Sequence, residues 1–134
     1  MAVFHRRPAG VTSTVAWQWN EPGSPTSLSR SRRDLSSPSS GEALVENTVI
    51  AFNPVDYKLI EAGGPHWHSG TNWRPGRIPG VDAVGIVRSV GQGVSQSLVG
   101  RAVAYHTDLR CHGTFATHTN TPAQCLIPVP DSSA

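Results

Sequence analysis

The histidines and cysteines are the first residues that could do chemistry, because imidazole and thiolate groups bind metal ions. His66 and His68 are separated by one residue, so an extended backbone would place both rings on one side of the chain. Cys111 and His112 could then complete a tetrahedral zinc site. Loop histidines beside tryptophans are more often hydrogen-bonded or solvated, and two adjacent residues do not easily share one ligand set. The pattern therefore favours no metal site.

The Gly91-Gln92-Gly93 segment is the only Gly-x-Gly in the sequence, and it invites comparison with a dinucleotide-binding loop. Such a loop needs a third glycine at a fixed offset, within a strand-turn-helix unit. Neither feature surrounds this segment. We therefore interpret it as a hairpin turn.

A second group of polar residues follows an apolar run that ends at Ala51. Asn53 can cap a helix, and the carboxylate of Asp56 is favoured near a helix N-terminus, so both residues have a sufficient local role. Tyr57 could pack its ring and expose its hydroxyl. His106 could donate a proton, although a lone histidine at a strand end is usually solvated.

The elements that would position these residues are short strands separated by turns. Thirteen glycines and eleven prolines are too many for a helical bundle and are typical of a mainly β chain. Short runs of apolar and β-branched residues predict strands over residues 15–19, 42–51, 82–90, 100–105, 113–119 and 125–129. Strands at this spacing suggest a small, partly open β-barrel.

One helix of two turns is expected after Asn53. Pro54 suits its first position, and Gly63-Gly64 supplies a left-handed C-terminal stop. Its expected inward face consists of Val55, Leu59 and Ile60.

Two further segments are predicted to be irregular. Residues 24–40 contain eight serines and few apolar residues, so they form a loop or a weak edge strand. Residues 65–79 combine proline and glycine with aromatic side chains, which indicates a loop whose Trp67 and Trp73 can line a pocket.

Charge gives little support for a polyanionic partner, since the formal net charge is +2. Five of the eleven basic residues precede Asp34, among serines and prolines, and we expect a solvated lead-in there rather than a nucleic-acid arm. Residues 1–14 contain arginine and no acid, but Pro8 and Gly10 interrupt any amphipathic helix. We interpret them as a disordered extension rather than a transit peptide.

The remaining composition favours a cytoplasmic protein. No apolar run is long enough to span a bilayer or to form a secretory core, so no membrane partner is expected. Cys111 and Cys125 form neither a CxxC nor an evident disulfide framework, and they are expected to be free thiols.

Five short motifs, in this order and at this spacing, resemble the GroES-like domain of medium-chain dehydrogenase/reductases. They are Asn53-Pro54-Val55-Asp56-Tyr57-Lys58, Ile78-Pro79-Gly80-Val81-Asp82, Val90-Gly91-Gln92-Gly93-Val94, Gly100-Arg101-Ala102-Val103-Ala104-Tyr105 and Gly113-Thr114-Phe115-Ala116. The resemblance implies one GroES-like domain over residues 15–130. It also implies that residues 131–134 are the truncated start of a nucleotide-binding domain.

The resemblance further indicates the zinc-independent, quinone oxidoreductase-like branch of that superfamily. Zinc-dependent members hold the metal with a cysteine and a His-Glu pair, and the matching positions here are Asn53, Val81 and Asp82. Amide and isopropyl groups do not replace thiolate or imidazole ligands, so no zinc is expected.

Such enzymes reduce an activated double bond or a carbonyl with hydride from NADPH, which binds in the cleft between two domains. By resemblance, Asn53, Val55 and Asp56 would border the nicotinamide, and Tyr57 and Asp56 would be catalytic. Without a Lewis acid, hydrogen-bond donors must stabilise the charge that develops on the substrate. The substrate side would be shaped by Tyr57, Trp67, Trp73 and Asp82.

Two functions follow as hypotheses. The first is the N-terminal part of an NAD(P)H-dependent reductase of a small molecule, inactive without a nucleotide-binding domain. The second is a stand-alone binding or assembly module, in which a homo-oligomer would cover the exposed face.

Overall fold

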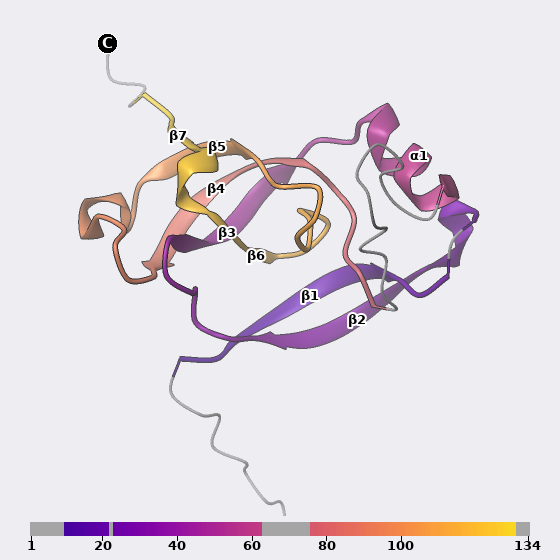
Figure 1. Ribbon diagram of the computed structural model, residues 1–134, viewed down its shortest axis with the longest axis horizontal. Coiled ribbons are helices and arrows are strands. Elements are labelled where there is room, and N and C mark those ends of the chain that lie inside the picture. Colours follow the sequence, from indigo (N-terminus) through magenta and orange to yellow (C-terminus); the bar gives the residue numbers. More distant parts are fainter. Residues whose placement is uncertain (1–9, 22, 63–75, 131–134) are drawn as a thin grey trace, which may run out of the picture.

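The computed structural model describes residues 10–21, 23–62 and 76–130 (Figure 1). The predictions for Gly63-Gly64, for Trp67 and Trp73, and for the histidine pair His66 and His68 lie outside the described residues, as do residues 1–9 and 131–134.

The chain begins with an antiparallel hairpin of β1 (Thr12–Trp19) and β2 (Leu28–Leu35). A short 3-10 turn, η1 (Pro25–Ser27), connects them, and the Ser24 side chain accepts the Thr26 N–H at 3.2 Å. Of the two predictions for residues 24–40, the edge strand is the one observed. It forms despite its polar composition because β1 supplies a complete ladder of backbone partners.

The first strand begins earlier than predicted. Thr12 to Thr14, which we assigned to the disordered extension, belong to β1, and Thr14 is fully buried. Its hydroxyl lies 3.1 Å from the Thr117 hydroxyl and accepts the His118 N–H at 3.0 Å. These long-range bonds order a segment whose local composition gives no strong strand signal.

The second sheet has five antiparallel strands in the order β6-β3-β4-β5-β7. Their bounds are Glu42–Ile50 for β3, Asp82–Val90 for β4, Ala102–His106 for β5, His118–Pro122 for β6 and Leu126–Pro128 for β7. Two further 3-10 turns are η2 (Gln96–Leu98) and η3 (Ala123–Cys125). The residues Gly91-Gln92-Gly93 follow β4 as a turn, which confirms their interpretation as part of a β hairpin connection.

The main core lies on one face of this sheet. Buried apolar side chains from β3, β4 and β5 pack together, and burial of each valine contributes about 1.5–3 kcal/mol. They are Ala43, Val45, Ala83, Val87, Val103 and Tyr105. The hydroxyl of Tyr105 donates to Asn47 Oδ1 at 2.6 Å, and burial raises the pKa of Tyr105 to about 12.

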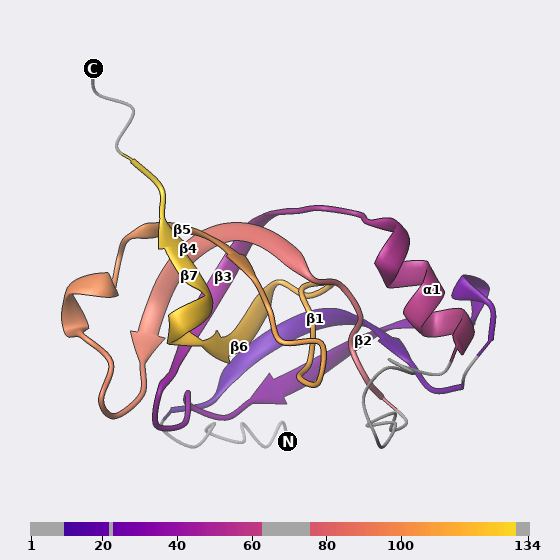
Figure 2. The same ribbon diagram turned by 45° about the horizontal axis from the view of Figure 1, so that its top comes forward.

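The hairpin lies along one side of the five-stranded sheet and closes part of a barrel (Figures 1 and 2). Trp17 N–H donates to the Phe115 carbonyl at 2.9 Å, and Thr117 N–H donates to the Val15 carbonyl at 2.8 Å. The predicted mainly β fold with a partly open barrel is confirmed.

The strand predicted over residues 113–119 was wrongly placed, because β6 begins at His118. Gly113 N–H donates to the Ile78 carbonyl at 2.8 Å, and Thr114 N–H donates to the Gly80 carbonyl at 3.1 Å. These bonds bring the segment against the chain that precedes β4. A Cβ at Gly113 would lie 2.1 Å from the Gly80 carbonyl oxygen, so the approach requires glycine.

The helix α1 (Pro54–Ala62) follows β3 and starts where predicted. Ile60 is buried, while Val55 and Leu59 are half-buried. The Ile60 carbonyl accepts the Gly23 N–H at 3.0 Å, which holds the helix beside the hairpin turn (Figure 1). Within the described residues, no helix is long and apolar enough to cross a membrane.

Candidate functional site

Three elements bring polar side chains to one end of the five-stranded sheet. Neighbouring strands run antiparallel, so the end of β3, the start of β4 and the end of β5 meet there. Asp82 lies directly opposite His106 in the β4–β5 register, and Ala51 N–H donates to the Asp82 carbonyl at 3.1 Å. The backbone therefore places Asn53, Asp82 and His106 together.

These side chains form a hydrogen-bonded group that we call the sheet-end cluster (Asn53, Asp56, Asp82 and His106). Asn53 Nδ2 donates to Asp82 Oδ2 at 2.9 Å, and His106 Nδ1 lies 2.6 Å from Asp82 Oδ1. Each carboxylate oxygen thus has its own partner, which fixes the orientation of the carboxylate. The Asp82 and His106 side chains are 39% and 62% exposed, and an ion pair at such exposure contributes about 0–1 kcal/mol to stability.

Asp56 connects this cluster to the helix. Its Oδ2 accepts the Asn53 N–H at 2.7 Å, and the Asn53 carbonyl accepts the Asp56 N–H at 3.0 Å. The sequence predicted Asn53 as the capping side chain, but the Asp56 carboxylate makes the side-chain cap and the Asn53 amide donates to Asp82 instead. That amide reaches Asp82 because the residues after β3 lie against the start of β4.

The environment of Asp56 favours its neutral form. Burial raises the pKa of Asp56, the bond from the Asn53 N–H opposes that rise, the charge of Asp82 adds to it, and the charge of His106 opposes it. Asp56 Oδ1 is buried and has no hydrogen-bond partner in the described part of the chain. Asp56 therefore interacts electrostatically with both Asp82 and His106.

The other predicted site residues on α1 lie beside the cluster without bonding to it. Tyr57 is 36% exposed, and its hydroxyl forms no hydrogen bond with any residue that the structure describes. Val55 is half-buried next to Asp56. The structure thus brings Asn53, Asp56 and Asp82 together, and Tyr57 follows Asp56 on the helix with its side chain partly exposed.

Apolar side chains are exposed on the segments that lead to the cluster. Phe52 is 71% exposed and stacks on buried Phe115, with ring centroids 5.5 Å apart. Val49 and Val84 face each other in the β3–β4 register and are 63% and 37% exposed, and Ile50 is 44% exposed. Grouped apolar exposure marks an interaction surface. We call these four residues, Val49, Ile50, Phe52 and Val84, the apolar border.

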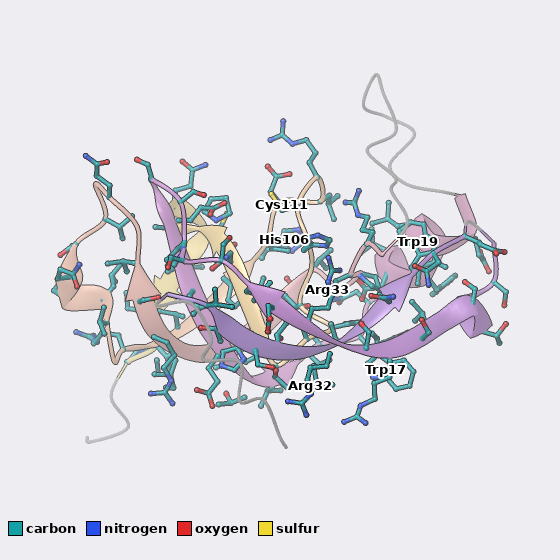
Figure 3. The ribbon with its side chains drawn as sticks, turned by 90° about the horizontal axis from the view of Figure 1, so that it is seen from below. Trp17, Trp19, Arg32, Arg33, His106 and Cys111 are labelled. Atoms are coloured by element: carbon teal, nitrogen blue, oxygen red, sulfur yellow. The ribbon has the colours of Figure 1, made fainter. Side chains whose placement is uncertain are left out.

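A second group of reactive side chains lines a cavity of about 650 Å³ between β2 and the loop that holds Cys111. We call it the hairpin cavity. His112 Nδ1 accepts the Ile78 N–H at 3.2 Å, and burial together with the charges of Arg33 and Arg77 lowers the pKa of His112. Figure 3 shows Arg33 and Trp19 on the side of the hairpin that faces Cys111 and His106, with Trp17 and Arg32 on the other side.

The thiols are unsuited to act as ready nucleophiles or ligands. Cys111 and Cys125 are free, as predicted, and burial raises the pKa of both. Thiolates rather than thiols are the reactive form. Among the described residues, no group of three histidine, cysteine, aspartate or glutamate side chains is arranged to hold a metal ion.

The sequence predicts a solvated histidine at the strand end, whereas in the structure His106 pairs with Asp82. The missing signal was the β4–β5 register, which places the two residues directly opposite each other. The connection between these strands includes the 3-10 turn η2, so counting residues in the sequence does not give that register. Phe52, between β3 and α1, was not singled out at all.

Comparison with known proteins gives the family. The model of the alcohol dehydrogenase GroES-like domain matches residues 39–131, so this chain belongs to the GroES-like domain of the medium-chain dehydrogenase/reductases. That resemblance is thereby confirmed. The trans-enoyl reductase tndF of Aspergillus flavipes is 29% identical over 119 residues, which are 84% of this chain and 32% of the relative.

Solved structures agree with this assignment. A Bacillus thuringiensis protein assigned as an NADPH:quinone reductase superposes with a TM-score of 0.75 at 28% identity, over 92% of this chain and 35% of that protein. A Rhizobium etli protein assigned as a zinc-dependent alcohol dehydrogenase gives a TM-score of 0.76 at 26% identity, with the same coverage of 92% and 35%. The chain therefore spans about a third of the length of these relatives.

Proposed function

We propose that this chain forms the substrate side of a zinc-independent, NAD(P)H-dependent reductase that acts on an enone, a quinone or a related carbonyl compound. The family membership supports the class of enzyme. The observation that carries the proposal is the bond between Asn53 and Asp82, which occupies two of the positions that hold zinc in other members. An amide and a carboxylate that bond each other are arranged for hydrogen bonding rather than for metal binding.

The described residues fit the nicotinamide end of the cofactor and not the whole dinucleotide. Every strand pair that the structure describes is antiparallel, so this part of the chain contains no parallel strand-helix-strand unit to hold a pyrophosphate. Val55 offers an apolar contact, and Asn53 and Asp56 offer polar ones. When bound, the cofactor would supply a hydride. NADPH would therefore need a nucleotide-binding domain beside this one.

The roles of the other residues follow from their exposure. Negative charge that develops on the substrate oxygen needs a donor in the absence of a Lewis acid, and the Tyr57 hydroxyl is open to provide it. Asp56 would act through Asn53, whose backbone it holds. The apolar border would contact the carbon skeleton of the substrate, together with Trp67 and Trp73, which stay predicted contacts.

A hybrid protein tests this function. The full chain is joined to the part of the Bacillus thuringiensis relative that the alignment leaves uncovered, and oxidation of NADPH is measured with 2-cyclohexen-1-one and with a benzoquinone. We expect turnover that needs both the substrate and this chain, with the uncovered part alone as the control. A hybrid that binds NADPH and reduces neither compound would contradict the proposal.

The apolar border also favours a second candidate function, a binding or assembly module without catalysis. Val49 and Val84 are exposed opposite each other in the β3–β4 register, Ile50 and Phe52 are exposed near them in the chain, and a second copy of the chain could cover such residues. Sedimentation of the full chain separates the candidates. A dimer that Phe52→Ser and Val49→Ser convert to a monomer supports the module, and a monomer at all concentrations argues strongly against it.

A further inference from the structure

We propose that His106, oriented by Asp82, is the proton donor of this reduction. The inference rests on the proposed function and extends it by assigning the residue that completes the reaction. His106 belongs to none of the five motifs that indicated the family. It is placed in the site by the strand register alone.

The geometry selects which nitrogen faces a ligand. A carboxylate accepts hydrogen bonds, so the hydrogen between Asp82 Oδ1 and His106 is carried by Nδ1, at 2.6 Å. The other carboxylate oxygen is held by Asn53 Nδ2 at 2.9 Å, so Asp82 cannot rotate without breaking a second bond. His106 Nε2 forms no bond with the residues that the structure describes and is the nitrogen open to a substrate.

Carboxyl groups from two elements lie near the ring. Asp82 faces it from β4, and the buried Asp56 of α1 interacts electrostatically with both Asp82 and His106. The remaining neighbour of β5 is β7, whose residues Leu126 to Pro128 carry no titratable side chain. The bond to Asp82 therefore fixes the ring with Nε2 as the nitrogen that can donate a proton. An exposure of 62% lets solvent return the proton after each turnover.

The substrate in this step is an enone. A hydride from a reduced nicotinamide forms a C–H bond at the β carbon, and the electron pair of the C=C bond moves toward the carbonyl to give an enolate. The enolate then takes the proton from His106 Nε2, whose bonding pair stays on that nitrogen. His106 becomes neutral and keeps its Nδ1–H on Asp82, and water restores the proton.

The first test measures the tautomer of the His106 ring in the full chain. NMR of the imidazole nitrogens gives the tautomer of neutral His106, and we expect the Nδ1–H form, whereas unconstrained histidine favours Nε2–H. In Asp82→Ala the Nε2–H form should dominate. Glu61→Ala, which removes an exposed carboxylate from α1, is the matched control and should leave the tautomer unchanged. An Nε2–H tautomer in the unmodified chain would overturn the proposal.

The second test uses the hybrid protein. His106→Gln keeps a side-chain donor for Asp82 but cannot release a proton, so kcat should fall about 100-fold, the lower end expected for loss of a general acid, while KM changes little. The decline of kcat at high pH that a proton donor produces should disappear in this variant, and Glu61→Gln should match the unmodified hybrid. Equal turnover by His106→Gln and the unmodified hybrid would overturn the inference while the proposed function stands. An unmodified hybrid that binds NADPH but does not reduce the enone would overturn the function itself.

Discussion

The sheet-end cluster and the hairpin cavity each contain a histidine near charged groups, yet their surroundings differ in sign. His106 bonds a carboxylate through Nδ1, and its side chain is 62% exposed. His112 instead uses Nδ1 to accept the backbone N–H of Ile78, with Arg33 and Arg77 nearby. The first bond fixes the ring through Nδ1, and the surroundings of the second ring lower the pKa of His112 and favour its neutral form.

This difference shows that histidine chemistry follows from the bond made by the second ring nitrogen. At the sheet end that bond leaves Nε2 directed away from Asp82 and able to donate a proton. In the hairpin cavity the ring is part of the packing that joins the loop at Gly113 to the segment before β4. The proposed function therefore involves the first region, whereas the second contributes hydrogen bonds that support the fold.

The largest expected effect tests the structural role of the cavity loop. In Gly113→Ala the new Cβ would lie 2.1 Å from the Gly80 carbonyl oxygen and 2.4 Å from that of Pro79. We expect a loss of about 3 kcal/mol in the free energy of unfolding, measured by urea denaturation. Gly93→Ala is the control, because the new Cβ would meet open space. This substitution should lower the free energy of unfolding by about 1 kcal/mol, since alanine is strained at a φ of 83°. Equal losses would contradict the packing argument.

The second prediction concerns NADPH. The full chain should not saturate with micromolar NADPH in a fluorescence titration, whereas the hybrid should, with affinity at least about 100-fold higher because a helix N-terminus then binds the pyrophosphate. Any NMR shifts that millimolar NADPH causes in the isolated chain should lie at the sheet end rather than at His112. Micromolar affinity of the isolated chain would refute this prediction.

The third prediction concerns the contribution of His112 to stability. His112→Gln should lower the free energy of unfolding by about 1 kcal/mol, because the acceptor for the Ile78 N–H is lost. Because the pKa of His112 is lowered from 6.5 in the folded chain, its neutral form contributes stability that is present above about pH 6.5 and is lost as pH falls below it. The free energy of unfolding, measured from about pH 5 to 8, should therefore fall less at low pH in the variant than in the unmodified chain. An unchanged pH dependence would exclude this role.

The smallest effect is expected for Asp56→Asn. The folded-state pKa of Asp56 is raised from 3.8, so its contribution to stability is fully present below that value and is lost as pH rises through the folded-state pKa. The amide keeps an acceptor for the Asn53 N–H but does not ionise. Stability of the variant relative to the unmodified chain should therefore rise with pH above about pH 4, and a parallel pair of pH profiles would argue against a raised pKa.

The fold was largely predictable because local patterns determine it. The apolar runs of β3 and β4, Pro54 at the helix start and the turn at Gly91 each place an element correctly from its own residues. The segments that sequence reasoning misplaced depend on distant partners. Thr14 is held in β1 by hydrogen bonds with Thr117 and His118. The segment 113–117 forms no regular strand, because the N–H groups of Gly113 and Thr114 donate to the carbonyls of Ile78 and Gly80.

The sequence predicted which residues belong to the candidate site better than it predicted the hydrogen bonds between them. Asn53, Asp56 and Asp82 were named from the family motifs, and the structure places them together. The roles of Asn53 and His106 required the three-dimensional arrangement, since the amide reaches across to another strand and the imidazole meets Asp82 through β-sheet register. Side-chain pairings between strands are not encoded in local composition.

One measurement tests the contrast between the two histidines most directly: kcat of the hybrid with NADPH and 2-cyclohexen-1-one, compared among the unmodified protein, His106→Gln and His112→Gln. We predict a fall of about 100-fold for His106→Gln and a change within about twofold for His112→Gln. Equal falls in the two variants, or a larger fall for His112→Gln, would contradict the assignment of the sheet end as the functional site.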